Sequence, residues 1–156
     1  MYWTIPYDVR PQASYPDHAA LQQALASIKQ SVQGERNDEL FYEELIRLAP
    51  TQEQKQIITS IRDDERKHNQ MFRYIYRSFT GQEITGVSSE QYYKPKTYLD
   101  GIQHALFGEL SAVERYRDIW KALPAGPYRD MLFEIILDEL KHASKYNYLF
   151  TLNRTA

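Results

Sequence analysis

The sequence contains no cysteine among its 156 residues. Disulfide bonds, thiolate zinc sites, iron–sulfur clusters and cysteine nucleophiles are therefore excluded. Any metal ion would have to be held by histidine and carboxylate side chains. Residues 1–8 also show no basic stretch followed by an apolar one, as a secretory signal would, so we expect a cytoplasmic protein.

A long apolar run and a surplus of basic charge are missing as well. No segment approaches the roughly 18 apolar residues of a membrane span, and the formal net charge is −2. We therefore expect neither a membrane protein nor a general nucleic-acid-binding protein. The length and the 42% of hydrophobic residues suit one ordinary globular domain with a single core.

Strand-like alternation is also absent, and apolar residues recur instead at helical spacing. Residues 80–95, with glycine, serine and a proline, form the one long connection. We therefore predict an all-α, up-down four-helix bundle over residues 17–152, with one long crossover between its second and third helices. The expected helices cover residues 17–49, 51–80, 96–122 and 128–152.

The first 16 residues differ from the rest of the chain. They contain three prolines and four aromatic residues. Because proline lacks an amide donor and fixes φ, this segment is predicted to be an extended arm rather than a helix. Its aromatic side chains suggest a strap on the bundle or a contact in a possible homodimer.

A set of polar residues occurs twice, at an offset of 74 positions. Each half reads Gly-Glu, then Tyr, then Pro, then Asp-Glu-x-Lys-His. Apolar residues repeat in any bundle, but a buried carboxylate or imidazole is costly unless it is paired or binds a metal ion. The repeated positions are Gly34, Glu35, Tyr42, Pro50 and 64–68 in the first half, and Gly108, Glu109, Tyr116, Pro124 and 138–142 in the second.

The spacing within each half predicts a metal site. A Glu-x-x-His pair places both side chains on one face of a helix, and in each half it follows the first glutamate by 30 residues. Four carboxylates and two imidazoles are the inventory of carboxylate-bridged di-iron and di-manganese bundles. Such ligands suit iron or manganese. The predicted ligands are Glu35, Glu65, His68, Glu109, Glu139 and His142.

On these residues, the chain resembles the ferritin-like superfamily of non-haem di-iron proteins, nearest to its rubrerythrin and bacterioferritin branches. The resemblance covers about residues 17–152 and implies a site for two iron ions, with manganese as an alternative. It implies that one glutamate in each half is a terminal ligand, Glu35 and Glu109. The glutamate of each Glu-x-x-His would bridge the ions, and each histidine would bind one of them.

The resemblance also implies roles for the residues around the ligands. Asp64 would orient His142, and Asp138 would orient His68, each by accepting a hydrogen bond from the second ring nitrogen. Tyr42 and Tyr116 follow the terminal glutamates by two helical turns and are candidate hydrogen-bond donors to the carboxylates; ordinary core packing is the alternative.

Other polar residues are expected to have no part in the site. His18 and His104 have no counterpart in the other half and are expected to be surface or packing residues. Lys67 and Lys141 are expected to be solvated on the outer face of their helices.

Two departures from the rubrerythrin pattern bear on activity. Full-length rubrerythrins carry a cysteine-ligated rubredoxin module that supplies electrons, and this chain has no cysteine. They also carry an extra carboxylate on the third helix, where this chain has Ala112. We therefore expect any electron donor to be a separate, unidentified partner.

Three functional hypotheses follow. The first is a di-iron oxidoreductase that reacts with O₂ or H₂O₂ in a ferroxidase- or peroxidase-like manner. The second is a non-catalytic iron-storage or shell protein that keeps the same site. The third is a bundle without metal that serves only as an interaction module, which the complete ligand set disfavours.

Overall fold

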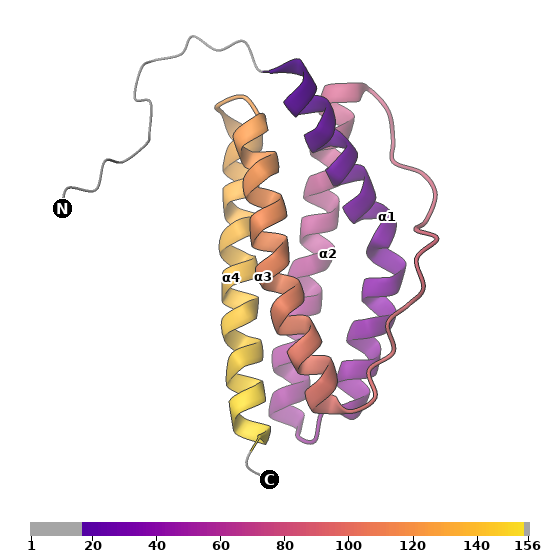
Figure 1. Ribbon diagram of the computed structural model, residues 1–156, viewed down its shortest axis with the longest axis vertical. Helices are drawn as coiled ribbons and strands as arrows, with labels where there is room; N and C mark the ends of the chain where they lie inside the picture. Colours follow the sequence, from indigo (N-terminus) through magenta and orange to yellow (C-terminus); the bar gives the residue numbers. More distant parts are fainter. Residues whose placement is uncertain (1–16, 155–156) are drawn as a thin grey trace, which may run out of the picture.

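The computed structural model describes residues 17–154, which form a single bundle of four helices. α1 and α2 make one antiparallel pair and α3 and α4 another, while residues 81–97 run the length of the bundle beside α1 (Figure 1). The prediction of an all-α, ferritin-like bundle with one long crossover is confirmed. The arm predicted for residues 1–16 lies outside the described residues. The helices are α1 (His18–Leu48), α2 (Gln52–Thr80), α3 (Tyr98–Ala122) and α4 (Pro127–Asn153).

α1, α2 and α3 begin where a side chain can replace a missing backbone partner. Asp17 accepts a hydrogen bond from the amide of Ala19 at 3.0 Å, and Thr51 and Thr97 cap α2 and α3 in the same way. α4 begins at Pro127, because a proline in the first turn gives up an amide that has no helical partner. The observed starts of α3 and α4 therefore differ from the expected ones by two residues and one residue.

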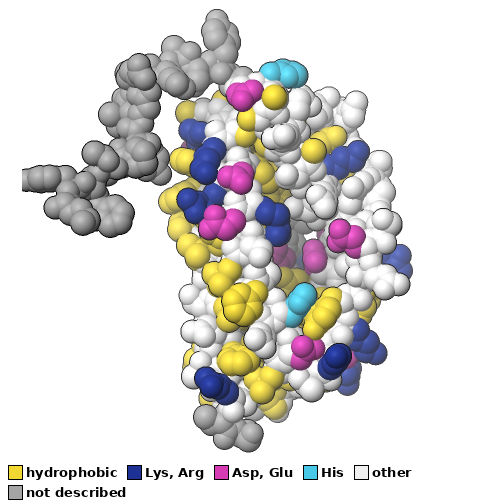
Figure 2. Space-filling view, viewed as in Figure 1, with side chains coloured by type: hydrophobic (Ala, Val, Ile, Leu, Met, Phe, Trp, Pro, Cys, Tyr) yellow, Lys and Arg dark blue, Asp and Glu magenta, His cyan; other side chains and the backbone are white. Residues whose placement is uncertain are grey.

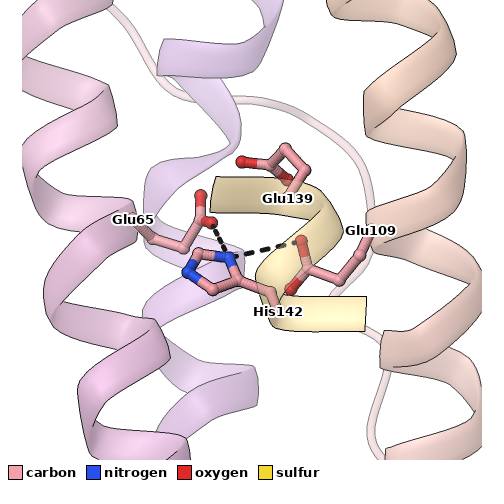
Figure 3. Close-up of side chains that lie close together, drawn as sticks. All are labelled: Glu65, Glu109, Glu139 and His142. Carbon is pink, nitrogen blue, oxygen red and sulfur yellow. Dashed lines mark ion pairs between the residues drawn. The ribbon is translucent and has the colours of Figure 1, made fainter. Parts of the chain in front are cut away.

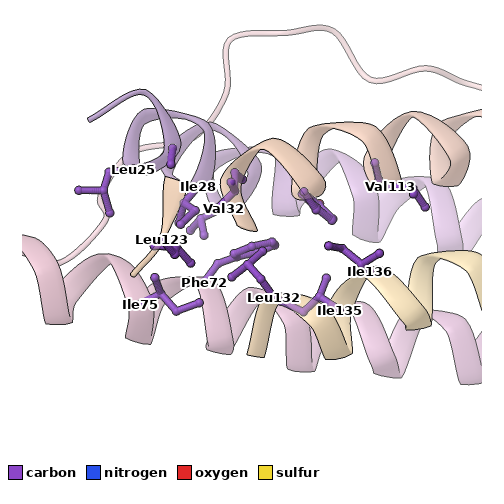
Figure 4. Close-up of a cluster of buried hydrophobic side chains, with 14 of the residues drawn as sticks. Leu25, Ile28, Val32, Phe72, Ile75, Val113, Leu123, Leu132, Ile135 and Ile136 are labelled. Atoms are coloured by element: carbon purple, nitrogen blue, oxygen red, sulfur yellow. The ribbon is translucent and has the colours of Figure 1, made fainter. Parts of the chain in front are cut away.

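Two hydrophobic clusters fill the two ends of the bundle. The first contains residues 24–32 of α1, Phe72 and Ile75 of α2, and residues from 112–136 of α3 and α4. Figure 4 shows this cluster. The second contains residues 42–49, 58–61, 102–105 and 146–149. On every helix, the predicted metal ligands fall between the two clusters, so they form a polar layer across the middle of the bundle.

The crossover is hydrogen-bonded to α1 at several points along its length. The amide of Ser88 donates to the carbonyl of Gln33 at 2.8 Å, and the side chain of Asn37 donates to the carbonyl of Glu90 at 2.9 Å. Further along, the Tyr92 hydroxyl donates to the carbonyl of Leu40 at 3.3 Å. These bonds hold a segment without regular secondary structure against the helix that carries Glu35.

Gly101 lets α3 approach α1 closely. A Cβ at this position would clash with Cδ2 of Leu45 and lie 3.0 Å from Cβ of Pro95. We expect Gly101→Ala to lower the free energy of unfolding by about 1–2 kcal/mol, because overpacking displaces neighbours that cannot all yield. Thermal and urea unfolding would measure this change.

Gly108, about two turns further along α3, is the matched control. A Cβ there would meet no atom within 4 Å. Gly108→Ala should therefore raise stability by about 0.5–1 kcal/mol, through the better helix propensity of alanine. Equal effects of the two substitutions would contradict the close approach at Gly101.

Candidate metal centre

Three helices bring four of the predicted ligands together. Glu65 comes from α2, Glu109 from α3, and Glu139 and His142 from α4 (Figure 3). One candidate ligand atom from each of these residues lies within 4.8 Å of all the others. Glu109, Glu139 and His142 are buried, so their charged forms are largely removed from water.

Both histidines turn the same ring nitrogen towards this cluster. Nδ1 of His142 lies 3.1 Å from Oε1 of Glu65 and 3.7 Å from Oε2 of Glu109. Nδ1 of His68 lies 3.1 Å from Oε1 of Glu139 and 3.4 Å from Oε1 of Glu65. His68 therefore joins the group, and Glu65 faces both imidazoles.

The opposite ring nitrogens face the two aspartates of the repeat, each from the other half. Nε2 of His142 lies 3.0 Å from Oδ2 of Asp64, and Nε2 of His68 lies 2.9 Å from Oδ2 of Asp138. An ionised aspartate only accepts hydrogen bonds, so each Nε2 carries the proton that it donates. In a neutral imidazole, Nδ1 is then a lone-pair donor directed at the centre of the bundle.

The centre contains buried polar atoms that lack partners. Oε1 of Glu65, Nδ1 of His68, Oε1 of Glu139 and Nδ1 of His142 make no hydrogen bond of acceptable geometry within residues 17–154. Unpaired buried acceptors are costly, and here acceptors face one another. A shared proton or a metal cation removes this conflict, so the donor set fits a pair of divalent cations with mixed carboxylate and imidazole ligands.

The pKa values show how protons balance these charges. Burial, with a contribution from the Glu65 carboxylate, raises the pKa of Glu109 to about 8. Burial likewise raises the pKa of Glu139 well above its ordinary value. For His68, burial is outweighed by the contacts with Glu139 and Glu65, which raise its pKa to about 11. Bound protons thus neutralise the carboxylates near pH 7.

Glu65 behaves differently from the other two carboxylates. Burial opposes its ionisation, but the contacts with His142 and His68 lower its pKa to about 2. It is therefore the carboxylate that stays ionised between two imidazoles.

Lys141 contributes to the site in a way that the sequence analysis missed. Its Nζ lies 2.6 Å from Oδ1 of Asp138 and 2.9 Å from Oδ2 of Asp64. Burial opposes the ionisation of Asp64, but its contacts with His142 and Lys141 outweigh burial and lower its pKa to about 2. Lys67 follows the expectation more closely, since it pairs with Glu134 and both side chains are more than half exposed.

Three buried tyrosines surround the polar layer. Tyr42 and Tyr116, the two predicted from the repeat, are buried, and burial raises the pKa of both hydroxyls. The third, Tyr146, is fully buried and its hydroxyl has no partner among the described residues. Its counterpart in the first half of the repeat is Phe72. A search for positions where one half has a polar residue and the other an apolar one could have identified Tyr146 from the sequence.

Glu35 is the predicted ligand that lies outside the cluster. Its carboxylate accepts a hydrogen bond from Nη2 of Arg73 at 3.1 Å, and its side chain is 42% exposed. It nevertheless lines a cavity of about 40 Å³ between α1 and α2, together with Asp38, Glu65 and His68.

A larger cavity connects the carboxylates with the surface. It measures about 300 Å³ and lies between α1, α3 and the crossover. Glu65, Glu109 and Glu139 line it on the inside, and Arg115 and His104 line it further out. His104 also stacks on Tyr93, with ring centroids 3.8 Å apart, in keeping with the packing role expected for it. Figure 2 shows a hollow between α1 and α3 with acidic side chains at its floor.

A helical bundle with a repeated glutamate and Glu-x-x-His set defines the ferritin-like class of carboxylate–histidine proteins. Comparison with protein families finds a similarity within this class: the Rubrerythrin family model matches residues 27–102, just under half of the chain. The matched part contains Glu35, Glu65 and His68, and the second half of the repeat lies beyond it. No curated protein matches this sequence.

Two solved structures share the fold. A conserved hypothetical protein from Mycobacterium tuberculosis aligns with a TM-score of 0.70 at 12% identity, covering 85% of this chain and 98% of that one. A hypothetical protein from Pyrococcus furiosus aligns with a TM-score of 0.69 at 20% identity, covering 85% and 89%. The family match and the Glu/His cluster together indicate di-metal binding. None of the helices in residues 17–154 is long and apolar enough to cross a membrane.

Proposed function

We propose that the protein binds two iron ions in the polar layer and that the loaded protein reduces O₂ or H₂O₂. The observation that carries this proposal is the set of four buried polar atoms, from Glu65, His68, Glu139 and His142, that have no hydrogen-bond partner within residues 17–154. Two iron ions held side by side would supply the electrons for reduction, and manganese is the alternative metal.

Each protein group has a distinct part in this proposal. Glu65 and Glu139 would bridge the ions, because each faces an imidazole of the opposite half. Glu35 and Glu109 would be terminal ligands, and Nδ1 of each histidine would complete the set. Asp64 and Asp138 hold the rings with Nδ1 pointing inward, and this fixes the tautomer that can bind a cation.

The surroundings suit a small oxidant that must exchange protons with the site. The cavity of about 300 Å³ reaches Glu65, Glu109 and Glu139, so O₂ or H₂O₂ can approach from the side of α1 and α3. Tyr42 and Tyr116 line the same cavity. Their raised pKa values keep both hydroxyls protonated, and they can donate hydrogen bonds to carboxylates. A separate electron donor would restore the reduced state.

Anaerobic reconstitution with ferrous iron tests the proposal. We expect about two irons per chain after removal of loosely bound metal, and a ferric absorption band that develops on addition of O₂ or H₂O₂. Comparing the rates with the two oxidants distinguishes an oxidase- or ferroxidase-like reaction from a peroxidase-like one. Failure to bind iron or manganese at near-stoichiometric level would refute the proposal.

A non-catalytic storage or shell role is the second candidate, and one observation favours it. Large apolar side chains are exposed along the outer faces of α3 and α4, and hydrophobic side chains gather over these helices in Figure 2. Such a surface is typical of self-association. Light scattering after size exclusion would separate a monomer or homodimer from a closed shell. The exposed residues are Phe107, Leu110, Phe133, Leu137, Leu140, Tyr148 and Leu152.

A further inference from the structure

The two terminal glutamates of the repeat have different surroundings. The side chain of Glu109 is 7% exposed, whereas that of Glu35 is 42% exposed. Glu109 lies 3.7 Å from the inward nitrogen of His142, but Glu35 is held by the guanidinium of Arg73. The two glutamates occupy equivalent positions in the sequence repeat but differ in exposure and in their contacts.

Arg73 is fixed by three hydrogen bonds, all of which it donates. Its Nε donates to Oδ1 of Asn69 at 2.7 Å, its Nη1 to the carbonyl of Ile84 at 3.1 Å, and its Nη2 to Oε2 of Glu35 at 3.1 Å. The repeat counterparts of Asn69 and Arg73 are Ala143 and Asn147. The second half therefore has no cation at the equivalent position to compete for Glu109.

The cavity beside Glu35 can hold an ion. Its volume of about 40 Å³ exceeds the roughly 10–15 Å³ that a cavity needs to hold one water molecule. His68, which is 2% exposed, lines it, and its Nδ1 makes no hydrogen bond to any residue of the described bundle. Asp38 also lines it, and its repeat counterpart is Ala112. This half of the site thus offers one more carboxylate than the other.

We propose that the two metal positions are unequal and that Arg73 sets the difference. One ion, held by Glu65, Glu109, Glu139 and His142, binds first and tightly. The second ion enters the cavity between α1 and α2 and binds weakly, because Arg73 competes with it for the Glu35 carboxylate. Asp38 supplies the second ion with a carboxylate, and this carboxylate is not paired with Arg73. This inference rests on the proposed di-metal function.

Anaerobic titration with Co²⁺, followed by calorimetry and visible absorption, tests the inference without any turnover. The wild-type protein should show two steps with dissociation constants at least tenfold apart. Arg73→Gln should tighten the second step by about fivefold and leave the first unchanged, since a partly exposed ion pair is lost as a competitor. Asp38→Asn should weaken the second step alone.

Arg77→Gln is the matched control. Arg77 lies one turn further along α2 and pairs with Glu83 at 3.1 Å, so its loss removes the same charge without freeing Glu35. Neither step should change. Arg73→Lys, which keeps the charge, should retain most of the separation between the steps.

The outcomes separate the two proposals. If no Co²⁺ binds near stoichiometry, the di-metal function itself fails. If two ions bind with equal affinity, the proposed inequality is overturned. If Arg73→Gln changes both steps together along with the melting temperature, Arg73 does not set the difference and only stabilises the crossover.

Discussion

Replacing Glu65 with glutamine is expected to abolish the binding of both metal ions. Oε1 of Glu65 lies 3.1 Å from Nδ1 of His142 and 3.4 Å from Nδ1 of His68, so it is the carboxylate that serves both halves of the site. Glutamine keeps the shape of the side chain but removes its charge. We expect the affinity for each ion to fall at least about 100-fold, beyond the effect of losing a residue that only orients a ligand.

Metal analysis of the reconstituted variant after gel filtration measures this effect. Glu114→Gln is the control, because Glu114 lies on the exposed face of α3 and pairs with Arg117 at 3.1 Å. The control should keep about two ions per chain. Two ions in Glu65→Gln would show that the bridging role carried over from the family resemblance is wrong for this residue.

The metal-free protein is expected to lose stability as the pH rises from 5 to 8. Glu109 has a pKa of about 8 in the folded state, and its unfolded value is about 4.3. The folded protein therefore holds a proton that the unfolded chain has released. This stabilisation is complete below the unfolded pKa and is lost as the pH rises through the folded one.

His68 acts in the same direction at higher pH. Its folded pKa of about 11 lies above its ordinary value, so its contribution is complete below about pH 6.5 and declines above it. Glu65, with a pKa of about 2, has the opposite sign, but only below about pH 4.5. Together these groups predict a loss of roughly 5 kcal/mol between pH 5 and pH 8.

Metal should reverse this trend. Bound cations displace the shared protons, so metal affinity rises with pH, and the difference in melting temperature between loaded and metal-free protein should widen from pH 5 to pH 8. Differential scanning calorimetry with and without Mn²⁺ measures both curves. Glu109→Gln should flatten the curve of the metal-free protein. A metal-free protein that gains stability over this range would contradict the proton-sharing account.

The sequence predicts the helices and the ligand positions for physical reasons that are local. Helical periodicity identifies which residues face inward, and Pro50 and the segment 123–127 mark two of the turns. A Glu-x-x-His pair shares a face whatever the rest of the chain does. The small errors at the starts of α3 and α4 come from Thr97 and Pro127, whose capping roles depend on local geometry.

Other parts of the site depend on how the helices are rotated and spaced, which periodicity does not contain. Lys141 reaches both Asp64 and Asp138 only because α2 and α4 lie side by side. The pairing of Glu35 with Arg73 likewise depends on a side-chain conformation. The cavities exist because the crossover and α3 leave space beside α1, and no motif marks such a space.

The crossed pairs between Asp64 and His142 and between Asp138 and His68 also bear on ancestry. Each helical hairpin supplies the aspartate that orients the other hairpin's histidine, so one hairpin alone could not have built this constellation. Two identical hairpins associated by a twofold axis would make both contacts at once. A gene duplication that fused such a pair through residues 81–97 would account for the repeat and for the difference between Arg73 and Asn147.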